Sequence, residues 1–387
     1  MDADLLVIGG GPAALAAAEG YRDQGGAGRV VLLSDDVDAP YHRPPLSKDF
    51  LRGESGRDAL PLRTLDWYAE REVELRLDTR AAAVDPAGRH VATADGEQIG
   101  YARLVLATGS RPLPLPVPGG DHPDVLLLRR IADSERIAAR AAAGRSAVVV
   151  GSGFIGCEAA ASLALLGLDV TLVTTEDLPQ AARLGEEVGR RIAGWLRADG
   201  LRLVTGSPVA AIENGRTVIP EVGEAVTADL VVVGAGIAPH AELAEAAGLE
   251  TRDGRVVTDE RLATSAPGVF AAGDIALARN AAAGRHLHVE HWGEAENMGE
   301  IAGRNAAGGD ATWAVAPGFW SEIGRHTLKY VAWGDGYDAT RLVPRDGGFT
   351  AYHGRGGELV GVLTHEADDD YEAGTALVER HAPYGGA

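Results

Sequence analysis

The stretch Val149–Glu158, which reads VVGSGFIGCE, decides how we interpret the chain. It follows an apolar run and opens an Ala- and Leu-rich helical pattern. That context distinguishes a dinucleotide-binding Gly-x-Gly-x-x-Gly turn from a chance match. Because the backbone N–H groups at the start of such a helix can bind a pyrophosphate, we expect a dinucleotide here.

A second fingerprint lies at the N-terminus. An apolar strand pattern at 5–8 is followed by the turn Gly9-x-Gly11-x-x-Ala14 and by a helical pattern. A further strand pattern ends at Asp35, about 20 residues beyond the glycines, where a carboxylate can accept a hydrogen bond from a ribose hydroxyl. Two dinucleotides in one chain predict electron transfer from one to the other.

The fingerprint at Val149–Glu158 is also followed by an acidic residue. Its second strand pattern is followed by Thr174, Thr175 and Glu176, and no basic residue occurs between this strand and Arg183. A carboxylate suits a ribose hydroxyl, whereas a 2′-phosphate requires arginine. Glu176 therefore favours NADH over NADPH.

The order of features repeats along the chain. The apolar closing strand at 102–112 has a loose counterpart at 228–239, so fingerprint, acid and closing strand all occur twice. This indicates an internal duplication. We predict an α/β fold with two Rossmann-like nucleotide-binding domains, the second inserted in the first, and a small α+β C-terminal domain. The expected boundaries are 1–111 with 240–310 for the first domain, 112–239 for the second and 311–387 for the third.

Composition restricts the partners. The net charge of −20 argues against nucleic acid and against an anionic membrane surface. The single cysteine, Cys157, excludes an intramolecular disulfide, a CxxC redox pair and a cysteine-ligated iron–sulfur cluster. The N-terminus is acidic, and no stretch approaches the roughly 20 apolar residues of a membrane span. We expect a cytoplasmic protein.

The loop at 39–50 contains three prolines, which stiffen its backbone, and it presents Arg43 and Lys48. Of the 36 basic residues, only Lys48 and Lys329 are lysines. This usage suggests that a compact ammonium group is needed at Lys48. Chance placement is the alternative.

Two further segments carry polar groups. Asp274 stands at a predicted helix start, where it can cap the helix or accept hydrogen bonds from a polyol chain. His286, His288 and His291 lack additional strong ligands with a recognisable spacing, so no metal site is expected. The aromatic residues of 311–387 are expected to form the core of antiparallel strands.

These motifs together resemble the FAD-dependent, NADH-linked ferredoxin and rubredoxin reductases that serve oxygenases. Apoptosis-inducing factor and monodehydroascorbate reductase are more distant relatives. The motifs that carry the resemblance are Gly-x-Gly-x-x-Ala at Gly9, Pro-Tyr-x-Arg-Pro-Pro-Leu-Ser-Lys at Pro40, Ala-Thr-Gly-Ser-Arg-Pro at Ala107, Gly-Phe-Ile-Gly-x-Glu at Gly153, Ala-Ala-Gly-Asp at Ala271, Glu-His-Trp at Glu290 and Phe-Trp-Ser at Phe319.

The resemblance implies FAD at the N-terminal fingerprint, which begins at Gly9, and NADH at the fingerprint that begins at Gly151. It implies that Lys48 and Glu158 form an ion pair beside the flavin N5, where an ammonium group stabilises the charge left by an arriving hydride. The residues it assigns to the cofactors are Gly9, Gly11, Pro12, Ala13, Ala14, Asp35, Arg43, Lys48, Ala82, Thr108, Gly109, Arg129, Gly151, Gly153, Phe154, Ile155, Gly156, Glu158, Glu176, Gly236, Gly273, Asp274, Glu290, His291, Trp292 and Trp320.

Two departures from the family pattern matter. The NADH-linked members usually end the second nucleotide strand in glutamate, whereas this chain has Thr174 there, so Glu176 is expected to take over. Ferredoxins are usually acidic and this chain is acidic too. We therefore predict a local basic patch, with the candidates Arg325, Lys329, Arg341 and Arg345.

The resulting hypothesis is a flavoprotein oxidoreductase, a monomer or homodimer. It takes hydride from NADH onto FAD and passes electrons singly to a ferredoxin or rubredoxin that feeds an oxygenase or cytochrome P450. One alternative is reduction of a small molecule such as a quinone, a radical or oxygen. Another is a redox-regulated binding protein similar to apoptosis-inducing factor. A disulfide reductase is excluded because no cysteine occurs near Tyr41.

Overall fold

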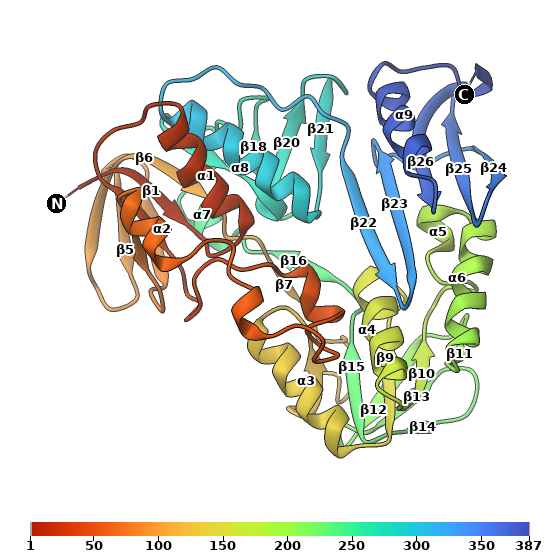
Figure 1. Cartoon of the computed structure of the whole chain (residues 1–387). Coiled ribbons are helices and arrows are strands. Elements are labelled where there is room, and N and C mark those ends of the chain that lie inside the picture. Colours follow the sequence, from red (N-terminus) through yellow and green to blue (C-terminus); the bar gives the residue numbers. More distant parts are fainter. Residues whose placement is uncertain (1, 387) are drawn as a thin grey trace. The chain divides into compact units, whose positions relative to one another are not determined.

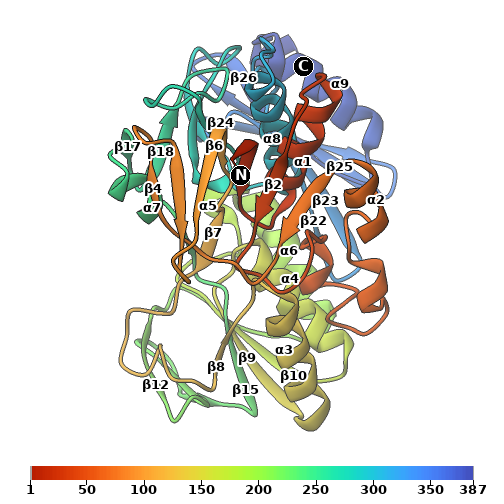
Figure 2. The same cartoon turned by 90° about the vertical axis from the view of Figure 1, so that its left-hand side faces the viewer.

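A computed structural model describes residues 2–386 of the chain, which form two compact units (Figures 1 and 2). Unit 1 is formed by Met1–His42, Leu60–Arg111 and Ala238–Phe319. Unit 2 is formed by Arg43–Ala59, Pro112–Ile237 and Trp320–Ala387.

Unit 1 is built on a parallel sheet with the strand order β3-β2-β1-β6, and β19 pairs with the other side of β6. These strands are Val73–Arg76, Val30–Leu33, Ala3–Ile8, Gln98–Leu106 and Val269–Ala271. The central strands are apolar and buried, as expected of a parallel sheet covered on both faces. The alanine-rich helix α1 (Pro12–Asp23) packs closely against α8 (Trp292–Ala306) because small side chains let the helices approach (Figure 1).

Antiparallel strands complete unit 1. The strands β4 (Ala81–Asp85) and β5 (His90–Thr93) extend β6 as a meander. A separate sheet has the order β17-β18-β20-β21, formed by Thr251–Arg252, Arg255–Thr258, Ala276–Asn280 and Arg285–His288. This second sheet was not expected from the sequence. It incorporates His286 and His288 as strand residues.

Unit 2 repeats the nucleotide-binding pattern. Its parallel sheet has the order β11-β10-β9-β15-β8. The strands are Arg202–Val204, Asp169–Val173, Ser146–Val150, Leu230–Val233 and Val125–Leu127. A meander of β12 (Val209–Glu213), β13 (Thr217–Pro220) and β14 (Val226–Thr227) precedes β15, as β4 and β5 precede the parallel part of β6. The predicted duplication is therefore confirmed in the sheet topology.

Unit 2 contains four helices of about three turns each, which accompany this parallel sheet and an antiparallel C-terminal sheet. They are α3 (Ile131–Ala143), α4 (Phe154–Leu165), α6 (Glu186–Ala198) and α9 (Asp368–Glu379). The C-terminal sheet is antiparallel with the order β22-β23-β26-β25-β24, and α9 packs on β26 and β23. Its strands are Gly318–Ile323, His326–Ala332, Glu358–His365, Gly348–Arg355 and Ala339–Arg345.

The predicted fold class is confirmed by these elements. The chain is α/β, with two Rossmann-like sheets and a small C-terminal α+β part. Within unit 2, α6 and the C-terminal sheet are in contact: the Trp195 ring stacks on the His326 ring with centroids 4.2 Å apart. Burial lowers the pKa of His326, and the neighbouring His365 lowers it further. The exact domain boundaries predicted above stay a prediction.

His353 is a buried histidine in the C-terminal sheet. Its side chain lies in the interior with 0% exposure, and its Nδ1 lies 3.0 Å from Thr340 Oγ1. Within residues 2–386, its Nε2 has no hydrogen-bond partner. Burial lowers the pKa of His353 to about 4. The folded protein therefore favours the neutral ring.

We expect His353 to make folding sensitive to acid. The unfolded chain binds this proton at about pH 6.5 and the folded chain only near pH 4, so the contribution is complete above pH 6.5 and is lost as the pH falls. In urea unfolding, the wild-type free energy should fall by roughly 1 kcal/mol per pH unit more than that of His353→Gln in this window. His288→Gln, at an exposed position, should retain the wild-type slope. Equal slopes for wild type and His353→Gln would contradict the prediction.

Candidate functional site

The carboxyl ends of neighbouring parallel strands in unit 1 carry most of the residues predicted for the first cofactor. The residues that follow β1, β2, β6 and β19 are Gly9 to Ala14, Asp35, Thr108 with Gly109, and Gly273 with Asp274. In doubly wound sheets, ligands bind outside this edge. The fold therefore brings together residues that lie up to two-thirds of the chain apart in sequence.

The first glycine turn leaves the start of α1 open. Gly9 has φ +146°, and a Cβ there would lie 2.1 Å from the backbone oxygen of Ala107, so only glycine fits. Gly11 is the N-cap residue, and a Cβ on it would meet nothing within 4 Å. No side chain of the described residues caps this helix. The open space at this helix start fits a pyrophosphate.

Three acids near this edge have different environments. Asp36 is buried and accepts a hydrogen bond from the Tyr41 hydroxyl at 3.1 Å, which gives it a structural role. Asp35 is exposed, as a ribose-binding carboxylate requires. Asp274 accepts a hydrogen bond from Ser110 Oγ at 2.5 Å, and each carboxylate oxygen can accept a further bond from a hydroxyl-rich ligand.

The other predicted residues of unit 1 lie outside the loops that follow these parallel strands. Ala82 lies in β4. Thr79, shortly before β4, donates its backbone N–H to the backbone oxygen of Ser34, just after β2, at 2.7 Å. Trp292 begins α8, and its ring centroid lies 5.7 Å from that of His42. Glu290 forms an ion pair with Arg255. His291 packs against Phe319 with centroids 4.5 Å apart.

Unit 2 presents a second edge of the same kind. The predicted residues that follow β9, β10, β15 and β8 are Gly151, Gly153 to Gly156, Glu176, Gly236 and Arg129. Gly151 has φ +104°, and a Cβ there would lie 2.5 Å from the Gly234 oxygen. Gly153 is the N-cap residue of α4, and no side chain within residues 2–386 caps this helix. This edge also fits a dinucleotide.

Arg43 and Arg129 are in contact in unit 2. Arg43 Nη1 donates a hydrogen bond to the backbone oxygen of Arg129 at 2.9 Å. One residue comes from the proline-rich loop and the other from the segment after β8. The fold thus brings together the two guanidinium-bearing residues predicted to bind pyrophosphate.

Lys48 and Glu158 form the predicted ion pair, with Lys48 Nζ and Glu158 Oε2 2.7 Å apart. Their side chains are only 8% and 3% exposed. Lys48 also donates to the backbone oxygen of Pro44 at 3.0 Å. The pair lies wholly within unit 2, because the proline-rich loop after His42 belongs to that unit.

The remaining partners of Glu158 were missed by sequence reasoning. Oε2 also accepts from Ser47 Oγ at 2.6 Å. Oε1 accepts from Ser321 Oγ at 2.7 Å and from Glu322 N at 3.3 Å. Both serines lie within motifs noted above, Leu-Ser-Lys and Phe-Trp-Ser, but sequence spacing alone could not bring them to one carboxylate. Beside Ser321, Trp320 is 43% exposed.

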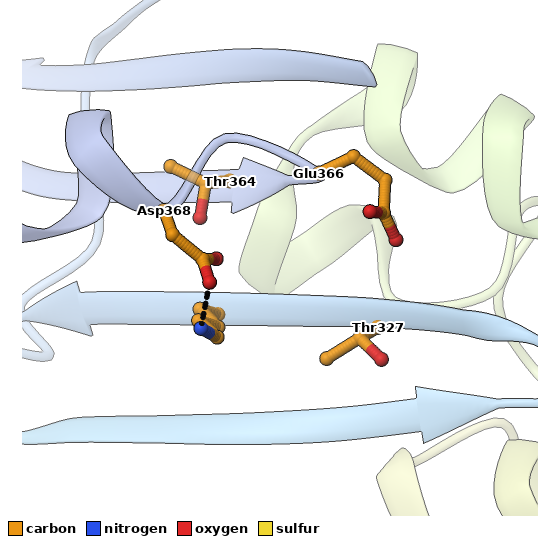
Figure 3. A pocket seen from close by; sticks show the side chains of 5 residues that line it. Thr327, Thr364, Glu366 and Asp368 are labelled. Atoms are coloured by element: carbon orange, nitrogen blue, oxygen red, sulfur yellow. Dashed lines mark ion pairs between the residues drawn. The ribbon is translucent and has the colours of Figure 1, made fainter. Parts of the chain in front are cut away.

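The predicted basic patch is partly compensated by acids. Lys329 lines a small polar pocket with Thr327, Thr364, Glu366 and Asp368, and its Nζ lies 2.7 Å from Asp368 Oδ2 (Figure 3). Arg345 Nε lies 2.6 Å from Asp370 Oδ2. Arg341 lies over the Tyr352 ring at 5.0 Å. Two of the four candidate charges are thus paired with acids, and the basic patch stays a prediction.

Neither a metal-binding cluster nor a membrane-spanning helix is found within residues 2–386. No cluster of three or more His, Cys, Asp or Glu side chains there could hold a metal ion. None of the helices in that part of the chain is both long and apolar enough to cross a membrane.

Comparison with known proteins identifies close relatives of this architecture. Residues 3–299 match the sequence model of the pyridine nucleotide-disulphide oxidoreductase family. The chain is 33% identical to a ferredoxin–NAD(P)+ reductase of Sphingomonas sp, over 98% of this chain and 93% of that protein.

Two solved structures match nearly the whole chain. The ferredoxin reductase for the CYP199A2 system from Rhodopseudomonas palustris has a TM-score of 0.93 at 31% identity, covering 98% of this chain and 95% of that one. The covalent putidaredoxin reductase–putidaredoxin complex also has a TM-score of 0.93 at 31% identity, covering 99% and 94%.

We expect the buried ion pair to behave as one unit in folding. Glu158→Gln leaves the buried Lys48 ammonium without a counter-charge, which should lower the free energy of unfolding by about 3 kcal/mol. Lys48→Met combined with Glu158→Gln should cost less than the sum of the single changes, because no unpaired charge remains. Urea unfolding of the four proteins measures this coupling.

The exposed ion pair between Arg57 and Glu135 provides the control. Its side chains are 50% and 46% exposed, so Glu135→Gln should change stability by less than about 1 kcal/mol. If the Lys48 and Glu158 changes are additive, the two residues are not energetically coupled.

Proposed function

Because the chain belongs to the pyridine nucleotide-disulphide oxidoreductase family, we propose that it is an NADH-dependent ferredoxin or rubredoxin reductase. The acceptor would in turn feed an oxygenase or cytochrome P450. Members of this family use FAD and NAD(P)H, and the chain is an oxidoreductase. The proposal extends to the assigned cofactor-binding residues, to the predicted domain boundaries and to a cytoplasmic location.

One observation carries the proposal of an external electron acceptor. The chain has two dinucleotide turns but a single cysteine, Cys157, which is buried and donates to Ser152 O at 3.3 Å. Burial raises the pKa of Cys157 far above its ordinary value, so the thiol stays protonated. With no second cysteine, electrons cannot leave through an intramolecular disulfide. They must pass to another molecule.

A bound FAD supplies the conversion between a two-electron donor and a one-electron iron–sulfur acceptor. The chain's own residues bind and orient it. In this proposal, Lys48 supplies a fixed positive charge to the reduced cofactor. The carboxylate of Glu158 holds that ammonium group, and Ser321 holds the carboxylate. Such a preorganised charge stabilises developing negative charge without reorganisation.

The acceptor is supported by the named relatives. The Sphingomonas protein is a ferredoxin–NAD(P)+ reductase, and one structural neighbour is a complex of a reductase with putidaredoxin. Both match more than nine-tenths of this chain. We therefore place a small iron–sulfur protein ahead of a quinone, a radical or oxygen as the acceptor.

The first test is an anaerobic titration of the purified flavoprotein with NADH, followed by mixing with a [2Fe–2S] ferredoxin, a rubredoxin or a quinone. We expect NADH to bleach the flavin absorbance and each FAD to reduce two equivalents of ferredoxin or rubredoxin, since these take one electron each. A quinone that is reduced faster than every iron–sulfur protein would replace the proposal with the small-molecule alternative.

Lys48 provides a second test. Lys48→Met should slow flavin reduction at saturating NADH by about 10²-fold, because the fixed charge is lost. Stopped-flow absorbance measures this rate. Arg57→Met, which removes an exposed charge from the short helical turn Arg57–Ala59 of the same unit, should leave the rate unchanged. An unchanged rate in Lys48→Met removes the proposed role of this lysine.

A further inference from the structure

The acid of the second nucleotide edge is displaced along the chain. The last residue of β10 is Val173, and the residue that follows it is Thr174, with Glu176 two positions further on. An acid at the end of this strand lies beside the glycine turn and can reach a ribose. Glu176 therefore needs something that returns its side chain to the turn.

A closed ring of hydrogen bonds holds the Glu176 side chain against the glycine turn. The amide N–H of Glu176 donates to Thr174 Oγ1 at 3.2 Å, and Ser152 Oγ donates to Glu176 Oε2 at 2.7 Å. Ser152 Oγ and Thr174 Oγ1 lie 2.7 Å apart. Because the single Ser152 proton goes to the carboxylate, the Thr174 hydroxyl must donate to Ser152 Oγ. Each donor in the ring is therefore polarised by the previous one.

Gln180 forms two further hydrogen bonds, one to Glu176 and one to Ser152. Its backbone N–H donates to Glu176 Oε2 at 2.9 Å, and its Nε2 donates to Ser152 O at 2.7 Å. Gln180 is 4% exposed and has φ +63°, a conformation that is costly for a residue with a side chain. The surrounding contacts impose this strain at the same place where they fix the carboxylate.

The second carboxylate oxygen is less engaged. Glu176 Oε1 accepts one long bond, from Ala182 N at 3.3 Å, and the residue is half-buried. A carboxylate oxygen can accept more than one hydrogen bond. The ring thus orients Glu176 while leaving acceptor capacity for a ribose diol. It also keeps a negative charge where a 2′-phosphate would have to sit.

We propose that Ser152, Thr174 and Gln180 are positioning residues that hold Glu176 for the adenosine ribose of NADH and thereby set the preference for NADH over NADPH. This rests on the proposed function only in taking the second edge as the nicotinamide nucleotide site. Thr174 at the strand end is then part of the recognition device, since its hydroxyl completes the ring.

The test uses the FAD-loaded protein and measures binding by calorimetry, independently of turnover. The probes are ADP-ribose and its 2′-phosphorylated form. The wild type should bind ADP-ribose at least tenfold more tightly than the 2′-phosphate. Ser152→Ala and Thr174→Val should each weaken ADP-ribose binding by about tenfold, since hydrogen bonds to a charged group are lost, with at most a threefold change for the 2′-phosphate.

Conservative and matched variants separate positioning from a general loss of structure. Thr174→Ser keeps the hydroxyl and should bind ADP-ribose as the wild type does. Thr171→Val removes a buried hydroxyl within β10, one bonded to Arg202 and outside the ring, and should leave both affinities unchanged. Gln180→Ala gives an independent variant if Thr174→Val fails to fold.

The inference is overturned if Ser152→Ala and Gln180→Ala bind ADP-ribose as tightly as the wild type, or if they lose both probes equally. It is also overturned if the wild type does not discriminate between the probes. These outcomes differ from a failure of the proposed function. A protein that discriminates as expected but reduces no iron–sulfur protein would disprove the acceptor and leave the ring's role intact.

Discussion

The buried ion pair between Lys48 and Glu158 is the constraint on which unit 2 depends. Placing two charges in the interior costs several kcal/mol for each ion unless their hydrogen bonds are satisfied. Here Glu158 accepts from Lys48, Ser47, Ser321 and Glu322 N, so both of its oxygens are fully used. The proline-rich loop, α4 and β22 must therefore keep their places together.

Helix α4 both begins at the glycine turn and carries Glu158. Its first residues follow the glycine turn, where the backbone N–H groups at the helix start fit a pyrophosphate, and Glu158 lies about one turn further along. Ser162, one turn beyond Glu158, donates to Ser47 O at 2.7 Å and fixes the loop that carries Lys48. Nucleotide binding and the placement of the ammonium group are thus tied to one rigid element.

The duplication shows how one sheet geometry accommodates different ligands. Both edges place a glycine turn, an acid and a closing strand at the carboxyl ends of parallel strands. In unit 1 the acid Asp35 is separated from the end of its strand only by Ser34 and is exposed. In unit 2 the acid is displaced and is brought back by side-chain hydrogen bonds. The backbone framework is common, and the side chains distinguish the two sites.

The sequence by itself determined the duplicated α/β fold and the two glycine turns, which rest on apolar periodicity and glycine spacing. The pairing of Lys48 with Glu158 was predicted from the resemblance to the ferredoxin reductases and not from a local signal. The sequence did not predict the sheet within 251–288, because its strands are short. It also did not predict helix α9, which begins with a run of aspartates. Nor could the sequence predict the hydrogen bonds from Ser47 and Ser321 to Glu158 or the hydrogen-bond ring that holds Glu176. Those contacts join residues from separate elements, and only packing in three dimensions decides which hydroxyl reaches which carboxylate.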